Sequence, residues 1–157
     1  MTEITRSAGG TEPGILDFPC GVKRLPSGNT LITDAGTEMG YGSELLEVDR
    51  EGELVRVIDH GFAFLHSVDV RREGEMLLAD TTNDRVVALD AGGSILFDSD
   101  WWSVGRGRLS DGTHLHYPNN VRCIDESHTL VTDRNNDRAV VVTDSGVVTR
   151  SIGGGIA

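Results

Sequence analysis

The chain has 157 residues and a formal net charge of −11, with 25 acidic side chains against 14 basic ones, of which only Lys23 is a lysine. This length suits one ordinary domain, and we expect residues 1–157 to form a single structural unit. The negative field opposes binding to nucleic acid and to anionic membranes, so we expect neither as a partner. An acid-rich, lysine-poor composition also suits a salt-rich, halophile-like cytosol, where screening shortens the reach of self-repulsion.

Nothing in the sequence indicates a targeting or membrane segment. Residues 1–10 lack the basic and apolar regions of a signal peptide, and no apolar run is long enough to span a bilayer. Cys20 and Cys123 lie far apart and show no CxxC spacing, which favours free thiols over a disulfide or a zinc site. We therefore expect a cytoplasmic protein.

The first predicted element is a short strand over residues 3–8. Its segment ITRSAGG (4–10) matches VTRSIGG (148–154) almost letter for letter. Because the later copy is the last strand of a repeat, the earlier one is predicted to be an extra outer strand.

Three repeats follow along the chain. The segments at 21–34, 67–80 and 120–133 align without gaps, and in each a valine is followed twelve residues later by an aspartate. The repeats continue through short β-branched runs, with Gly52, Gly93 and Gly146 at one equivalent turn. Each repeat offers four short strands bounded by turn residues. The sequence therefore predicts an all-β fold of three four-stranded antiparallel β-propeller blades, at about 19–58, 65–98 and 118–152.

Three blades are too few to close a ring, since propellers typically have about four or more. Two explanations remain open at this stage. Either the chain is the first half of a longer propeller, or two copies self-associate to complete a ring.

The sequences of the repeats resemble those of known propeller families. Two segments look like NHL repeats, whose usual sequence pattern is P-x-G-V…G-x-x-Y-V-A-D-x-x-N-x-R-V. They are HSVDV…GEMLLADTTNDRVVALDAGGSIL (66–96) and PNNVRCIDESHTLVTDRNNDRAVVVTDSGVV (118–148). DFPCGVKRLPSGNTLITDAG (17–36) is similar to blades of arylsulfotransferase-like propellers, and less so to gluconolactonases. The resemblance covers nearly the whole chain.

The resemblance implies two possible activities. Arylsulfotransferases use top-face histidines and an arginine, and His66 occupies a matching position. The family's arginine position falls near Thr81 and Thr82, however, which departs from the pattern. A lactonase-type hydrolase would need a metal site of Glu, Asn and Asp that three blades do not clearly assemble.

The longest predicted connection, residues 98–120, concentrates aromatic, basic and imidazole side chains on the face where chemistry is expected. Long ordered loops are often functional, tryptophan and tyrosine offer flat apolar area, and arginine binds carboxylate, phosphate or sulfate. The alternative is that this loop packs between blades. The candidate ligand-binding residues are Trp101, Trp102, Arg106, Arg108, His114, His116, Tyr117 and Asn119.

Three aspartates, Asp34, Asp80 and Asp133, end the second strand of each repeat. Carboxylates that converge on the propeller axis could hold a divalent cation such as calcium. The alternative, favoured by their presence in every repeat, is that each aspartate accepts backbone N–H bonds at its own turn.

His66 stands at the channel mouth, where the other repeats have Cys20 and Asn119. It could act as a general base or nucleophile, helped by Asp80 or Asp69, or simply satisfy hydrogen bonds. The sequence thus predicts a scaffold that binds a small molecule or protein at its top face. The alternatives are an enzyme centred on His66 and a purely structural partner joined through exposed blade edges.

Overall fold

The computed structural model describes residues 16–37 and 41–154. Its strands form three separate four-stranded antiparallel sheets, and within each sheet consecutive strands are neighbours. The first sheet contains β1 (Pro19–Arg24), β2 (Thr30–Asp34), β3 (Glu44–Val48) and β4 (Leu54–Ile58). The second contains β5 (Leu65–Val70), β6 (Met76–Asp80), β7 (Arg85–Leu89) and β8 (Ile95–Asp98). The third contains β9 (Pro118–Cys123), β10 (His128–Asp133), β11 (Arg138–Thr143) and β12 (Val148–Gly153).

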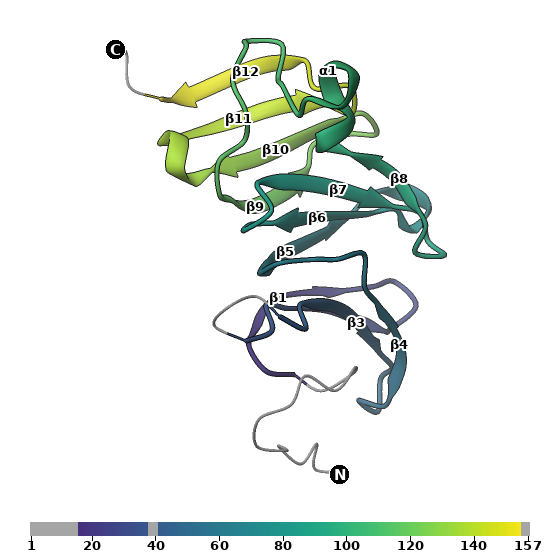
Figure 1. Cartoon of the computed structure of the whole chain (residues 1–157). Coiled ribbons are helices and arrows are strands. Elements are labelled where there is room, and N and C mark those ends of the chain that lie inside the picture. The colour runs from purple at the N-terminus through teal and green to yellow at the C-terminus, as the bar shows by residue number, and fades with distance from the viewer. Residues whose placement is uncertain (1–15, 38–40, 155–157) are drawn as a thin grey trace.

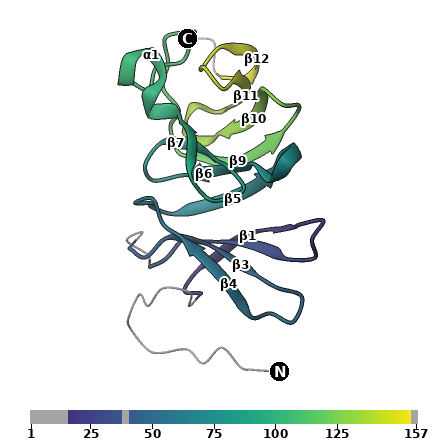
Figure 2. The ribbon, with the colours of Figure 1, turned by 90° about the vertical axis from the view of Figure 1, so that its right-hand side faces the viewer.

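The sheets stack one on another from the N-terminal to the C-terminal part of the chain (Figures 1 and 2). Their first strands lie at the inside of the array, where β5 packs against both β1 and β9. The second sheet is buried on both faces: Leu78 belongs to a core shared with the first sheet, and Leu77 to a core shared with the third. This is why its middle strands are apolar on consecutive residues.

The connections between strands divide between two ends of the array. We call the end where β2, β6 and β10 finish the top face, and the opposite end the bottom face. The long connection from β8 to β9 contains a 3-10 helix (Ser99–Trp101) and the one-turn helix α1 (Trp102–Gly105). Two more 3-10 helices follow β5 at the bottom (Arg72–Gly74) and β10 at the top (Arg134–Asn136).

The prediction of an all-β fold with three four-stranded antiparallel repeats is confirmed. The extra strand predicted at residues 3–8 lies outside the described residues. Among residues 16–37 and 41–154, no helix has the length and apolar character needed to cross a bilayer.

Candidate functional site

A β-bulge begins the innermost strand of every sheet. The pairing register shifts across one residue in each case: Cys20 in β1, His66 in β5 and Asn119 in β9. Bulges redirect side chains and are frequent beside functional sites. Each of the three expected mouth positions is therefore held in a backbone irregularity at the top of its sheet.

A recess of about 360 Å³ opens on the top face between the second and third sheets. Its walls come from the starts of β5 and β9 and from the turns that follow β6 and β10. The lining residues are Phe64, His66, Thr81, Thr82, Tyr117, Asn119 and Arg134. Three residues predicted from the sequence, His66, Tyr117 and Asn119, thus come together in one hollow.

Two aromatic residues of the recess have left-handed backbone conformations. Phe64 has φ 61° and Tyr117 has φ 53°, values that bulky residues rarely adopt. The Tyr117 conformation is held by its N–H, which donates to Asp84 Oδ1 of the second sheet at 2.7 Å. The Phe64 ring lies 5.8 Å from Phe18 and 6.2 Å from His66, centroid to centroid, and is stacked on the imidazole. The strained backbone therefore places an aromatic wall beside His66.

His66 is half-buried, and burial lowers the pKa of its imidazole below the usual value. A hydrogen bond to the backbone of Asn119 opposes this shift, and the Arg134 guanidinium adds to it. The ring is therefore neutral at pH 7, while Arg134 supplies a positive charge. No ion pair or side-chain hydrogen bond from the described residues occupies that guanidinium, which leaves it available to an anion.

The other two mouth positions carry less chemistry. Burial, with a smaller contribution from Asp34, raises the pKa of the Cys20 thiol, so Cys20 is a weak nucleophile.

Asp69, one of the suggested partners of His66, pairs with Lys23 at 2.6 Å and accepts the Cys123 N–H at 2.9 Å. These contacts hold the three innermost strands together.

Asp80, the other suggested partner of His66, is engaged by its own sheet. Its Oδ1 accepts the Ala63 N–H at 2.7 Å, and its Oδ2 accepts Asn83 Nδ2 at 2.9 Å and Arg85 Nε at 2.7 Å. Arg85 also reaches Asp98 at 2.6 Å. Burial alone would lower the pKa of Arg85, but pairing with these carboxylates raises it, so the guanidinium stays charged.

The same arrangement recurs in the third sheet and in part in the first. Asp133 accepts the His116 N–H at 2.7 Å and Arg138 Nε at 2.8 Å. Asp34 accepts the Phe18 N–H at 2.7 Å, although its sheet has no corresponding arginine. Each carboxylate thus fastens the incoming top-face connection to the end of the second strand, which is the structural alternative considered from the sequence.

The structure does not bring the three aspartates together. Among the described residues, no group of three or more His, Cys, Asp or Glu side chains is placed to hold a metal ion. Asp34, Asp80 and Asp133 are each fully buried and accept backbone N–H groups from the connection that leads into their own sheet. Their oxygens therefore face donors and not a shared central point.

Trp102, one of the expected ligand-binding residues, is only 5% exposed and belongs to the core between the second and third sheets. Its ring stacks on Phe97 at 6.3 Å, and its indole N–H donates to the Asp144 carbonyl at 2.9 Å. The ring also packs over Gly146, where a Cβ would lie 2.7 Å from it. This tryptophan seals the junction between sheets, because its flat apolar surface is already covered.

The other candidates from the long connection, up to His116, are exposed and lie outside the recess lining, whereas Leu109 and Leu115 of the same connection are buried in the core with Trp102. Arg108 pairs in a β-bridge with His114 and donates to the Gly112 carbonyl at 2.6 Å, so it closes a local loop. His116 contacts the Tyr117 ring edge-on at 5.7 Å and thus borders the recess. The predicted residues that the structure leaves outside the recess lining are Trp101, Trp102, Arg106, Arg108, His114 and His116.

Sequence reasoning missed Arg134 as a site residue. The resemblance places the family's arginine after the second strand of the same repeat, at Thr81 and Thr82, whereas Arg134 follows the second strand of the next repeat. Phe64 was also missed, although a usable signal exists: Phe18, Phe64 and Tyr117 each stand two residues before a mouth position.

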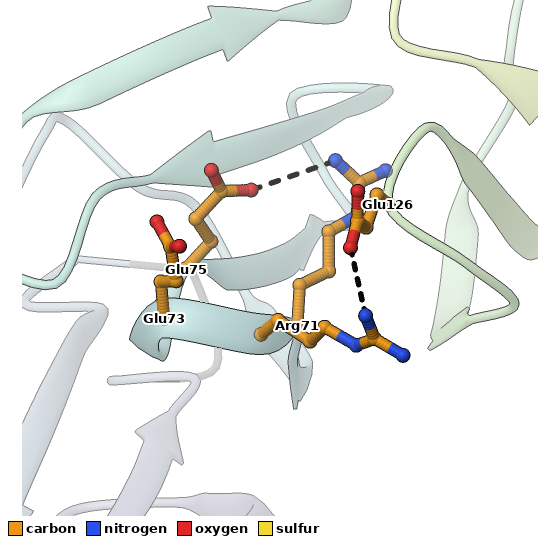
Figure 3. Close-up of a pocket in the computed structure, with 5 residues that line it drawn as sticks. Arg71, Glu73, Glu75 and Glu126 are labelled. Atoms are coloured by element: carbon orange, nitrogen blue, oxygen red, sulfur yellow. Dashed lines mark hydrogen bonds and ion pairs between the residues drawn. The ribbon is translucent and has the colours of Figure 1, made fainter.

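A second hollow, of about 390 Å³, lies on the bottom face and is drawn in Figure 3. Arg71 lines it and is buried; it donates to Asp144 at 2.6 Å and to Thr129 at 2.9 Å, while its Nε has no partner among the described residues. Glu75 lies 3.8 Å from Arg71, and Arg72 pairs with Glu126. Because these charges pair with one another and Arg71 joins two sheets, we assign this hollow a structural role.

No protein-family model matches the chain, and no curated protein sequence matches it. Solved structures do. Hydrazine synthase from Kuenenia stuttgartiensis matches with a TM-score of 0.64 and 15% identity, over 95% of this chain and 39% of that one. Virginiamycin B lyase from Staphylococcus aureus matches with a TM-score of 0.61 and 14% identity, over 87% and 41%. The WD40 β-propeller domain of Doa1 matches with a TM-score of 0.60 and 14% identity, over 85% and 39%.

These likenesses establish the fold. The three sheets are blades of a β-propeller, which confirms the predicted fold class. The chain spans less than half the length of each of the solved chains compared, so it corresponds to an incomplete ring.

Proposed function

We infer that this propeller module binds a small molecule carrying an anionic group in the top-face recess between the second and third blades. The observation that carries the inference is the position of Arg134 in the same recess as a neutral His66 and the Tyr117 ring. A guanidinium binds sulfate, phosphate or carboxylate oxygens, and an aromatic wall suits a flat apolar group. An aryl ester of sulfate or phosphate combines both.

The test is calorimetric titration with phenyl sulfate and with inorganic sulfate. Arg134→Gln should weaken phenyl sulfate binding at least about tenfold, because the charge-assisted hydrogen bonds are lost. Arg72→Gln is the matched control, since Arg72 is an exposed arginine of the bottom face. Equal affinities in the two variants, or no binding of either anion, would refute the proposal.

Sulfuryl transfer is a second candidate function, and one observation favours it. His66 and Arg134 come from different blades but line one recess, which supplies the histidine and arginine that an arylsulfotransferase-like site uses. In this reaction an imidazole nitrogen of His66 would attack the sulfur of an aryl sulfate. The N–S bond forms as the bond from sulfur to the aryl oxygen breaks and the aryl oxide leaves. A phenol acceptor then attacks the sulfur, the N–S bond breaks, and the phenol proton passes to solvent, which restores the neutral imidazole.

Turnover of 4-nitrophenyl sulfate with phenol as acceptor tests this second candidate. His66→Ala should abolish release of 4-nitrophenolate while the variant still binds phenyl sulfate. Unchanged turnover in His66→Ala would exclude sulfuryl transfer through His66, and ligand binding would then be the function that this recess supports.

The remaining partner expectations belong to the same proposal. The charge of −11 disfavours nucleic acid and anionic membranes. The unpaired state of Cys20 and Cys123 supports a reducing, cytoplasmic location. Self-association is also included, since an incomplete ring leaves blade faces without a neighbouring blade.

A further inference from the structure

Every blade has a face that looks toward the blade before it in sequence, which we call its preceding face. Val22, Val68 and Val121 are equivalent on this face, as each pairs with the residue at the centre of the next strand. Val68 is 3% exposed and Val121 is fully buried, because the preceding blade covers them, whereas Val22 is 71% exposed. The preceding face of the first blade is therefore built like the two that are covered.

The outer part of the same face repeats the pattern. Leu54, Ile95 and Val148 are equivalent, since each forms the last pair in the ladder between the third and fourth strands of its blade. Ile95 and Val148 pack against the cores between blades, while Leu54 is 49% exposed. An apolar residue stands at this position in all three blades, yet within residues 16–37 and 41–154 only two of the three have a blade to pack against.

The opposite face of each blade, its following face, is open at the other end of the array. Ile58 of the first blade is 9% exposed because the second blade covers it, while Ile152, its equivalent in the third blade, is 58% exposed. Likewise Arg71, three residues after Val68, is buried. Its equivalent in the third blade is Ile124, three residues after Val121, which is 52% exposed. In the part of the chain that the structure describes, the array thus ends in one open preceding face and one open following face.

The equivalent turn glycines show what these faces would meet. A Cβ built at Gly93 would lie 2.9 Å from Ile58 of the blade before it, and one at Gly146 would lie 2.7 Å from Trp102. At Gly52 a Cβ would meet no atom within 4 Å. The Gly52 turn of the first blade therefore has room for a residue in the position of Ile58, and Ile152 is the residue equivalent to Ile58 at the far end of the array.

The charged residues support the same pairing of the third blade's following face with the first blade's preceding face. Arg56, two residues before Ile58, reaches to 3.9 Å from a Cβ built at Gly93. Its equivalent in the third blade is Arg150, which is exposed, and Glu51 is exposed beside Gly52. Packing the following face of the third blade on the preceding face of the first would bring Arg150 close to Glu51.

We propose that a second copy of this chain completes the ring, with the following face of each third blade packed on the preceding face of the other copy's first blade. At each of the two junctions between the copies, a following face then packs on a preceding face, as happens twice within one chain, between the first and second blades and between the second and third. Two copies contribute six blades, and the three solved chains named above, of which this chain covers 39–41%, are each more than twice its length. A two-fold axis relates the copies, so the assembly closes and leaves no blade face open.

Light scattering over a range of concentrations tests the proposal on the 157-residue chain. The wild type should have twice the monomer mass of 16.9 kDa. Val22→Glu should raise the dimer dissociation constant at least about tenfold, because an unpaired carboxylate would be buried at both junctions. Leu96→Glu is the matched control, since Leu96 is a 47% exposed hydrophobic residue of β8, a strand of the middle blade. It should leave the mass unchanged.

A charge exchange identifies the junction independently of folding. Arg150→Glu should weaken the dimer, because it places like charges beside one another, and adding Glu51→Arg should restore it. Both residues are exposed, so neither change disturbs a core. A monomeric wild type, as expected if further blades of a longer protein cover these faces, would overturn the proposal. So would assembly that grows with concentration beyond two copies, or failure of Glu51→Arg to restore Arg150→Glu.

Discussion

Asp80→Asn is the sharpest test of how the top face is held in place. The substitution keeps the shape of the side chain and the acceptor for the Ala63 N–H, but it turns the oxygen that receives Asn83 Nδ2 and Arg85 Nε into an amide donor. Breaking a buried ion pair costs about 3 to 5 kcal/mol. Because Arg85 keeps its contact with Asp98 at 2.6 Å, we expect the lower end, about 3 kcal/mol.

For a domain of this size, a loss of about 3 kcal/mol lowers the melting temperature by about 6 to 12 °C. Urea and thermal unfolding followed by circular dichroism measure both quantities. The control is Asp49→Asn, because Asp49 Oδ1 accepts the Glu51 and Glu53 N–H groups in a surface turn and an asparagine oxygen can do the same. That change should stay within about 0.5 kcal/mol. An Asp80→Asn variant as stable as this control would show that the buried carboxylate does not fasten the connection.

Three further outcomes are expected. The pKa of His66 should lie below 6.5 by NMR titration because burial disfavours the charged ring, so this group's contribution to stability should fall as the pH drops below 6.5; a higher midpoint would contradict this. Trp102→Ala should cost about 3 to 5 kcal/mol in urea unfolding, and a cost under about 1 would refute its role in the core. Calcium chloride at millimolar concentration should raise the melting temperature by less than about 1 °C, whereas a larger rise that vanishes in Asp34→Asn would support a cation held by Asp34, Asp80 and Asp133.

Local patterns account for most of the fold prediction. A strand of a twisted sheet needs only β-branched and apolar residues with turn residues at its ends, and both signals are local in sequence. The twelve-residue spacing from Val68 to Asp80, repeated from Val121 to Asp133, therefore located the inner two strands of each blade. The sequence was less informative about the long connection, because tryptophan suits both a binding surface and a core. Residues distant in sequence bury Trp102, and this burial makes it a core residue and not part of a binding surface.

The candidate site shows the same division. Counting along the repeats was enough to put His66, Asn119 and Cys20 at equivalent mouth positions, and the recurrence of the aspartates was enough to favour turn architecture over chemistry. Neither could place Arg134 next to His66, because a recess between two blades depends on how the sheets stack and twist. The sequence alone determined the strands, their order and the repeat, since these follow from short-range patterns. Only the tertiary structure decided which side chains share a hollow and which blade faces stay open, because both depend on packing between segments far apart in the chain.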